Sequence, residues 1–439
     1  MTDETSGKSE SSLARTVPWT PPVAASAHSD VGMRRANNQD NFRIVLSTDS
    51  EQWKRTGDLL IVADGMGAHA AGELASEMSV KGIPLNYLKL HAKADPADAL
   101  QRAFEETNRE IFLRGTENPE FRNMGTTTSA VAFLPHGALI AHVGDSRIYR
   151  LRGNILEQLT FDHSLVWEMS QNGDVSEEAL RDSGIPKNVI TRSLGPGPSV
   201  LVALEGPFPI KKGDRYLLCS DGLTGPVRDE EIGIVLGLLD IETACKALVD
   251  LANVRGGPDN ITVVIGELHR DSLASDATSI EKTTRPGSRF PLPFGVAATI
   301  GLLAAIFLIL VQQMPLAILF AAASLVSLFT GWIKMAMNTP TTPRDSQLGK
   351  APYRKYSCSP SLSFATDLKT AIEGLIDWFV ENGRTNKLDG LRAKLKHADA
   401  QIESKDLKSA TSSLLVLLVD VMREIRSQKN DEAEGQIEY

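Results

Sequence analysis

Five aspartates stand where apolar, strand-like segments begin or end. Asp64 follows the apolar run of "LLIVADG", and Asp221 follows that of "YLLCSDG". Asp145 comes after a third run in "AHVGDSR", whereas Asp40 and Asp259 precede the runs of "QDNFRIV" and "PDNITVV". A single aspartate of this kind is most simply a turn or cap residue. Five in equivalent positions predict a cluster at one end of a sheet, where carboxylates repel one another unless a cation lies among them.

The available side chains restrict the kind of cation. The three cysteines are widely spaced and odd in number, which predicts neither a disulfide framework nor a cysteine-based zinc site. Carboxylate oxygens without cysteine and with little histidine favour a hard cation, Mg²⁺ or Mn²⁺. Gly65 lets the chain turn away after Asp64 and lets backbone and water approach closely.

The elements that must position these aspartates are short strands with tight connections and several helices. Short connections between strands indicate antiparallel pairing, and helices grouped between locally paired strands indicate an α+β layered domain rather than a doubly wound parallel sheet. The predicted strands are 41–47, 58–64, 126–134, 138–145, 147–152, 155–160, 215–221 and 260–268, and the predicted helices are 70–90, 96–113, 164–171, 229–237 and 241–253.

A series of motifs in this region resembles the metal-dependent Ser/Thr phosphatases of the type 2C (PPM) family, in its bacterial form. The resemblance covers about Ser26 to Leu268, and it implies a PP2C-like α-β-β-α sandwich with helices on both outer faces. It also implies hydrolysis of phosphoserine and phosphothreonine in phosphorylated protein substrates by a metal-activated water, opposing a Ser/Thr kinase in signalling. The motifs are "SDVGMRRANNQDN", "VADGMGAHAAGELAS", "MGTTTSA", "HVGDSRIYRL", "LTFDHSLV", "ITRSLG", "CSDGL" and "GGPDNITVV".

The resemblance assigns metal ligands. Asp64 would bridge two ions, Mn²⁺ or Mg²⁺, and the carbonyl of Gly65 would also be a ligand. Asp221 and Asp259 would hold one ion. Asp40 would bind the other, largely through water. Two ions in such a site activate a water for in-line attack on phosphorus.

The resemblance also assigns a weaker third ion and a phosphate ligand. Asp145, together with Asp221, matches the site of the third ion. Arg35 matches the arginine that grips the substrate phosphate, which a guanidinium does with two parallel hydrogen bonds. Arg34 competes for that role, but the spacing to Asp40 favours Arg35. Residues 172–195 match the flap beside the active site, where substrate choice is expected.

Three residues depart from the family pattern. Gln39 replaces the glutamate that often precedes the metal aspartate, which removes one charge beside the ligands. Ala68 replaces the second glycine of "DGMGGH". Met66 stands where many eukaryotic members have a histidine proposed as general acid, and methionine there is common among bacterial members.

Two other functions compete with this interpretation. A haloacid-dehalogenase-type phosphatase needs a second aspartate two residues after the nucleophile, but Met66 and Leu223 occupy those positions after Asp64 and Asp221. A catalytically weak or inactive domain acting as a membrane sensor or scaffold would have lost metal aspartates, and none is lost. Mn²⁺-dependent turnover of p-nitrophenyl phosphate would separate the active enzyme from the scaffold.

The chain of 439 residues is long enough for two or three domains, and its net charge of −9 argues against nucleic-acid binding through phosphate contacts. The polar N-terminus has no signal-peptide pattern. We predict a disordered N-terminus over 1–24, the phosphatase domain over 25–270, linkers over 271–290 and 338–360, an apolar hairpin over 291–337, an amphipathic helical region over 361–428 and an acidic disordered tail over 429–439.

Residues 291–337 predict a transmembrane helical hairpin. Phe294–Val311 and Leu316–Ile333 are uncharged stretches of 18 residues, each about 27 Å long as a helix, and neither has a polar face. Arg285, Arg289 and Lys334 lie only on the outer flanks, which places both ends in the cytoplasm. We expect a cell-membrane protein whose phosphatase domain and tail are cytoplasmic. A hairpin that dips in from the cytoplasmic side is the alternative.

Residues 361–428 carry apolar residues at spacings of three, four and seven, which predict amphipathic helices. A three-helix bundle and a self-associating or partner-binding coil both fit this pattern. The three apolar sets are Phe364, Leu368, Ile372, Leu375 and Phe379; Leu388, Leu391, Leu395 and Ile402; and Leu407, Leu414, Leu418, Val421 and Ile425.

Overall fold

The computed structural model divides the chain into two compact units. One unit comprises residues 1–273 together with 349–439, and the other comprises residues 274–348. The structure describes residues 19–67, 70–92, 94–172, 189–272, 292–337, 348–349, 353–381 and 388–435. The predictions for 1–18, for Ala68, for most of the flap and for parts of both linkers lie outside these residues.

The first unit is built on two antiparallel sheets. One has the order β1-β11-β10-β7-β8-β12, and the other has the order β2-β3-β5-β6-β9 with β4 paired to β3. The strands are β1 Val23–Asp30, β2 Asp40–Val45, β3 Asp58–Met66, β4 Gly125–Thr126, β5 Thr128–Leu134, β6 Gly137–Val143, β7 Arg147–Arg152, β8 Ile155–Gln158, β9 Ala203–Phe208, β10 Arg215–Cys219, β11 Ile261–Leu268 and β12 Arg354–Ser357.

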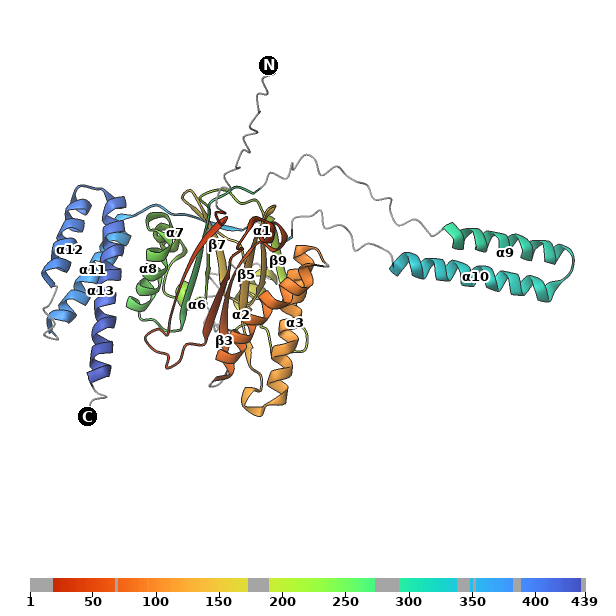
Figure 1. Cartoon of the computed structure of the whole chain (residues 1–439), viewed down its shortest axis with the longest axis horizontal. Helices are drawn as coiled ribbons and strands as arrows, with labels where there is room; N and C mark the ends of the chain where they lie inside the picture. Colours follow the sequence, from red (N-terminus) through yellow and green to blue (C-terminus); the bar gives the residue numbers. More distant parts are fainter. Residues whose placement is uncertain are drawn as a thin grey trace, which may run out of the picture. The chain divides into compact units, whose positions relative to one another are not determined.

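Helices cover the outer face of each sheet (Figure 1), which confirms the predicted sandwich. α2 and α3 lie against the sheet of β2 and β3, whereas α7 and α8 lie against the sheet of β1 and β11. The helices are α1 Ser50–Thr56, α2 Ala70–His91, α3 Pro96–Glu117, α4 Leu165–Asn172, α6 Asp221–Thr224, α7 Asp229–Leu238 and α8 Ile241–Val254, with the short 3₁₀ helix η1 Pro119–Phe121.

Apolar side chains fill the space between the two sheets. Leu60 and Val131 come from one sheet, Ile148 and Leu218 from the other, and all four are fully buried. The ring of Phe133 meets that of Tyr216 edge-on across the interface, with 4.9 Å between centroids. Side chains alternate between the faces of a strand, so the same strands also present residues to the outer helices.

The tail forms three helices that pack onto this domain. α11 Leu362–Glu381, α12 Leu388–Glu403 and α13 Leu407–Gly435 contact one another, and α13 also lies against α8 (Figure 1). Their apolar residues share one core with α7 and α8. Arg426 of α13 forms an ion pair with the fully buried Asp250 of α8. The three helices therefore form a bundle within the chain that packs on α8, and self-association stays a prediction.

Two boundaries in the tail differ from the predictions. The predicted linker over 338–360 contains a strand, β12, that pairs antiparallel with β8 over Arg354–Ser357. α13 continues to Gly435, although we predicted disorder from residue 429. In both cases charged, polar sequences take regular structure because tertiary contacts or helix continuation outweigh their composition.

The second unit is a helical hairpin of α9 Leu292–Leu310 and α10 Met314–Met337. Small residues lie where the two helices meet, since Ala305, Ala317 and Ser324 are buried. Over its described residues, no helix of the chain combines the length and the apolar character that a membrane crossing requires. The predicted transmembrane spans at 291–337 are therefore not supported, although the hairpin itself is present.

A buried carboxylate fixes the end of α8, where the chain turns toward Asp259. Only 2% of the Glu231 side chain is exposed, and the guanidinium of Arg255 donates to both of its oxygens, at 2.6 and 2.8 Å. The backbone and side chain of Arg228 donate to the same carboxylate at 3.0 and 2.8 Å. Burial alone would raise the pKa of Glu231, but these hydrogen bonds outweigh it and lower the pKa to about 2.

We predict that Glu231→Gln lowers the free energy of unfolding by about 1–3 kcal/mol, because it removes charge-assisted hydrogen bonds and leaves Arg255 without its charged partner. Denaturant melts at pH 7 would measure the loss, with the exposed Glu230→Gln as the matched control. The pKa is lowered in the folded state, so the stabilisation is complete above the ordinary value of 4.5 and is lost as the pH falls toward 2. An equal loss at pH 7 and at low pH would contradict the assignment.

Candidate metal centre

Asp40 and Asp64 lie directly opposite each other in the β2–β3 pair. Asp40 is 5% exposed, and its Oδ2 accepts a hydrogen bond of 2.7 Å from Ser220, which belongs to the other sheet. The carbonyl of Asp64 accepts from the Thr126 hydroxyl at 2.9 Å and from the Thr127 amide at 2.9 Å. The strand end that carries Asp64 is therefore fixed on its other side as well.

Asp221 and Asp259 come from the second sheet. Asp221 begins α6 just after β10, and Asp259 ends the loop before β11. Gly222 lets the start of α6 lie close to the loop before β11, because a Cβ at this position would lie 1.9 Å from the carbonyl oxygen of Asn260. The side-chain amide of Asn260 donates to the carbonyls of Val31 and Asn37, at 2.9 Å each. These hydrogen bonds connect the loop to the segment before β2.

Asp145 lies in the turn between β6 and β7. Gly144 before it has φ of 114°, a conformation that favours glycine. His163 fixes this turn, since the Gly144 amide donates to His163 Nδ1 at 3.0 Å and the His163 amide donates to the Gly144 carbonyl at 2.8 Å. His163 thus holds the turn beside Asp145.

The five aspartates form one electrostatic cluster. Burial raises the pKa of Asp64 well above its usual range, and the charges of the other four raise it further. Burial is also the main cause that raises the pKa values of Asp40 and Asp145, each to about 7. The pKa of Asp221 is raised by burial and by the charge of Asp259. The neighbours that act on Asp64 are Asp40, Asp221, Asp145 and Asp259.

Three carboxylate oxygens of this cluster are buried and have no hydrogen-bond partner among the described residues. They are Oδ1 of Asp40, of Asp145 and of Asp221. Over the same residues, no three His, Cys, Asp or Glu side chains converge closely enough to form a complete metal-binding group. Buried oxygens that lack a donor fit a hard cation, which prefers such ligands.

Arg35 extends to this cluster. Its guanidinium lies 2.6 Å from Oδ2 of Asp259, and half of its side chain is exposed. Within the described part of the chain, Arg34 forms no ion pair of this kind, and the choice of Arg35 over Arg34 as the phosphate ligand stays a prediction. A guanidinium that is half exposed beside the cluster has donors left for an anion arriving from solvent.

Gly65 takes a position that no larger residue could occupy. A Cβ there would lie 2.1 Å from the carbonyl oxygen of Gly72 and 2.6 Å from that of Gln39. The amide of Gly65 donates to the Gln39 carbonyl at 3.1 Å. The glycine after Asp64 is therefore required by the close approach of α2, and the role of its carbonyl as a metal ligand stays a prediction.

Two supporting residues escaped the sequence analysis. Ser220 precedes Asp221 and orients Asp40, and Asn260 follows Asp259 and donates or accepts bonds that join three segments. Both residues could have been found from the sequence, because each is adjacent to a candidate ligand. Thr126 and Thr127 also hold the backbone of Asp64.

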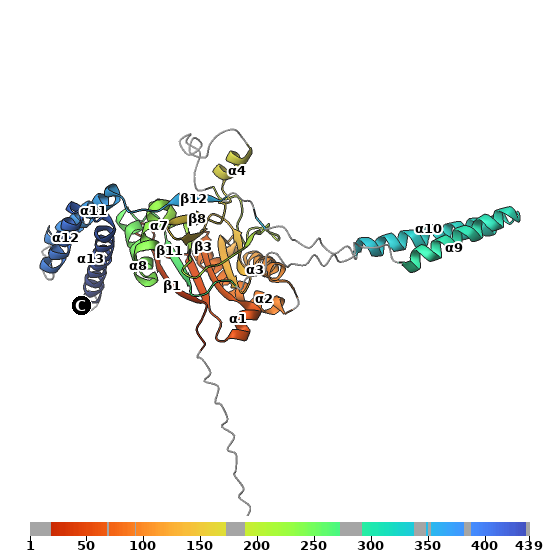
Figure 2. The same ribbon diagram turned by 90° about the horizontal axis from the view of Figure 1, so that it is seen from above.

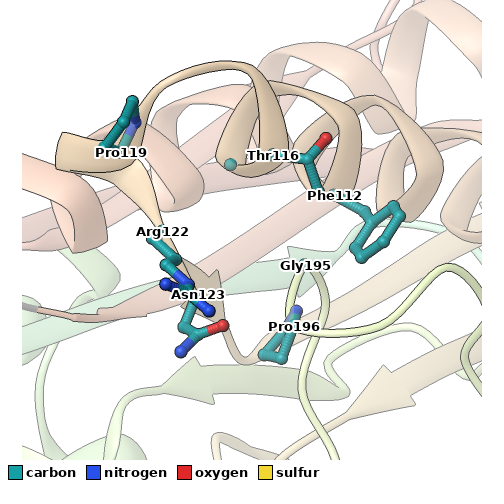
Figure 3. A pocket seen from close by; sticks show the side chains of 8 residues that line it. Phe112, Thr116, Pro119, Arg122, Asn123, Gly195 and Pro196 are labelled. Atoms are coloured by element: carbon teal, nitrogen blue, oxygen red, sulfur yellow. The ribbon is translucent and has the colours of Figure 1, made fainter.

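A pocket of about 330 Å³ lies elsewhere on the domain, between the end of α3, the turn after η1 and the Gly195–Pro196 segment (Figure 3). Phe112, Arg122 and Asn123 contribute to its wall, and none of the five aspartates does. The aspartate cluster is accordingly not part of this pocket.

Comparisons with known proteins agree on one family. Residues 28–240 match the family described as Protein phosphatase 2C. A putative protein phosphatase 2C-type of Streptococcus pyogenes is 36% identical over 250 residues, which are 56% of this chain and 97% of the relative. The serine/threonine phosphatase stp of Listeria monocytogenes is 35% identical over 258 residues, which are 58% of this chain and 99% of the relative.

Solved structures give the same result. The serine/threonine phosphatase PstP/Ppp of Mycobacterium tuberculosis is 34% identical with a TM-score of 0.51, and the match covers 56% of this chain and 99% of that one. The serine/threonine phosphatase of S. agalactiae is 36% identical with a TM-score of 0.50, over 56% of this chain and 99% of that one. Such likenesses cover the sandwich and leave the hairpin and the tail helices unmatched.

Proposed function

This chain belongs to the protein phosphatase 2C family and is a protein serine/threonine phosphatase, and from that premise we propose that the aspartate cluster is its metal-dependent active site. Asp64, Asp221 and Asp259 would hold one Mn²⁺ or Mg²⁺ ion. Asp64 and Asp40 would hold a second, with the Gly65 carbonyl as a further ligand, and Asp145 with Asp221 would bind a third. When bound, the ions supply Lewis-acid activation of the attacking water.

The observation that carries this proposal is the set of buried carboxylate oxygens without hydrogen-bond partners on Asp40, Asp145 and Asp221. An inactive scaffold would gain stability by replacing such residues with apolar or neutral ones. All five aspartates remain, in two sheets, with their backbones fixed. That arrangement favours an active enzyme over a sensor or scaffold that has lost catalysis.

The chain's own residues then bind and orient the substrate. Arg35, held beside the cluster by Asp259, would grip two phosphate oxygens with parallel hydrogen bonds. Ser220 and Thr127 keep Asp40 and Asp64 in place while the phosphate binds. Met66 offers no proton, so the leaving alkoxide takes its proton from water or from another side chain.

We predict that phosphatase activity requires added Mn²⁺ or Mg²⁺ and disappears with EDTA. Asp64→Ala and Asp221→Ala should each lower kcat by several orders of magnitude, since each removes a carboxylate from the proposed ligands. Turnover of p-nitrophenyl phosphate, with circular dichroism as the control for folding, would measure both effects. Full activity of a folded Asp64→Ala variant would refute the metal assignment.

We predict that Arg35→Ala raises KM for a phosphopeptide with a smaller loss in kcat, because the guanidinium mainly holds the phosphate in the ground state. Arg34→Ala is the matched control, an arginine of the same segment that should leave KM unchanged. Steady-state kinetics of both variants would test the choice. A raised KM in the Arg34→Ala variant alone would show that the roles are reversed.

We further propose that the α9–α10 hairpin attaches the enzyme to the cell membrane, with the phosphatase domain and the tail helices in the cytoplasm. The described residues of the hairpin support this, because large apolar side chains are exposed along both helices. Contiguous apolar surface of this kind is characteristic of lipid or protein contacts. Leu303, Phe307, Ile318 and Leu325 are 67, 65, 68 and 68% exposed.

We predict that deleting residues 291–337 moves the protein from washed membranes to the supernatant while p-nitrophenyl phosphate turnover stays within about twofold, since all proposed ligands lie outside the deletion. Immunoblots of fractionated cells would measure the shift. An intact chain already in the supernatant would contradict the attachment. Labelling of a Gln312→Cys variant by an impermeant thiol reagent from outside would distinguish a hairpin that crosses the membrane from one that does not.

A further inference from the structure

Residues that follow the hairpin in the sequence contact the phosphatase domain near the start of α4. The ring of Tyr353 stacks on Phe161 at 5.6 Å between centroids and meets Phe208 edge-on at 5.4 Å. Phe161 in turn stacks on Trp167 of α4 at 4.9 Å. The guanidinium of Arg354 lies 5.1 Å from the centroid of the same Trp167. Trp167 is thus held by an aromatic ring and by a cation, and Figure 2 shows α4 beside β12.

The segment that follows Phe161 is bonded to the backbone next to a cluster aspartate. His163 holds Gly144, the residue before Asp145, through two hydrogen bonds. The segment that leads into α4 is therefore fixed on this turn by His163 itself.

Residues 189–194 form a segment that follows α4 and contacts the backbone near Asp64. Its Ile190 pairs with Ser164, and its Thr191 hydroxyl donates to Glu168 of α4 at 2.8 Å. Leu194 pairs with Thr126, whose hydroxyl donates to the carbonyl of Asp64. α4 and this segment are thus joined by hydrogen-bonded contacts to the backbone beside Asp145 and to that of Asp64.

We propose that Tyr353 and Arg354 are positioning residues of the phosphatase, which fix α4 and thereby determine how well a phosphorylated protein chain fits beside the aspartates. Both act through Trp167 and Phe161 and touch no reacting group. They lie outside residues 28–240, the part that matches the family, so this support belongs to the segment that follows the hairpin. The proposal rests on the phosphatase activity and does not depend on which aspartate holds which ion.

The contacts of Tyr353 and Arg354 are strong enough to affect how firmly α4 is held. A cation–π contact that is partly shielded from water changes an equilibrium by a factor of about 2–30. β12 holds Arg354 firmly, since it pairs with β8 over four residues. A small aryl phosphate needs only the cluster and Arg35, whereas a phosphopeptide also needs the flanking α4.

The test compares two substrates in the full-length enzyme, a phosphothreonine peptide and p-nitrophenyl phosphate. Arg354→Ala should raise KM for the peptide by about fivefold or more, with kcat for the peptide and both constants for p-nitrophenyl phosphate within about twofold. Tyr353→Ala should behave alike. Tyr353→Phe should restore the wild-type KM, because it keeps the ring and loses only the hydroxyl bond to Glu205. Lys355→Ala, on the same strand, is the matched control and should resemble the wild type.

Three results would overturn the proposal. A peptide KM unchanged by both Arg354→Ala and Tyr353→Ala would show that these residues position nothing that the substrate uses. Equal losses on both substrates together with a lowered Tm would show a structural role only. A peptide KM raised as much by Lys355→Ala would assign the effect to β12 as a whole. Failure of the wild-type enzyme to turn over p-nitrophenyl phosphate would instead count against the proposed active site.

Discussion

The structure depends on holding several carboxylates together at one edge of a sandwich, where they repel one another. Desolvation and mutual charge make the ionised cluster unfavourable in the absence of a cation. Rigid backbone must therefore supply the support. Strand pairing places Asp40 opposite Asp64, and glycines at 65 and 222 let neighbouring segments come close enough to lock the turns. The protein thus keeps an energetically unfavourable group of carboxylates at the proposed site, as is common at functional sites.

The two sheets contribute to the cluster jointly. Ser220 of one sheet orients Asp40 of the other, and Asn260 joins the loop of Asp259 to the segment before β2. The apolar core between the sheets keeps these partners in register, and Glu231 with Arg255 fixes the start of the Asp259 loop from outside. Small shifts between the sheets would separate aspartates that the two sheets carry, so packing far from the cluster contributes to its geometry.

Sequence patterns predicted most of the sandwich because its inner strands are apolar runs that end at turn residues. They missed β1, β9 and β12, whose sequences "VAASAHSD", "ALEGPF" and "RKYS" lack such runs and become strands through their neighbours. The tail helices were predictable from their periodicity, but their docking on α8 was not, because it depends on a face of another helix. Residue type and position identified the five aspartates and Arg35 as candidates, and their roles stay predictions. The partners Ser220 and Asn260 act over more than a hundred residues of chain, and local patterns carry no such information.

Because β12 pairs with β8, the hairpin is an insertion within the phosphatase unit and not an extension at its end. Residues 274–348 do not trail from the end of the phosphatase; the chain leaves a folded unit, forms the hairpin, and returns to complete that unit's sheet and its second core. A protease cut within 274–348 would therefore yield two fragments that remain associated without a covalent link. It also means that a gene shortened to the length of its relatives would leave β8 as an open edge and the apolar face of α8 in water, two features that promote aggregation.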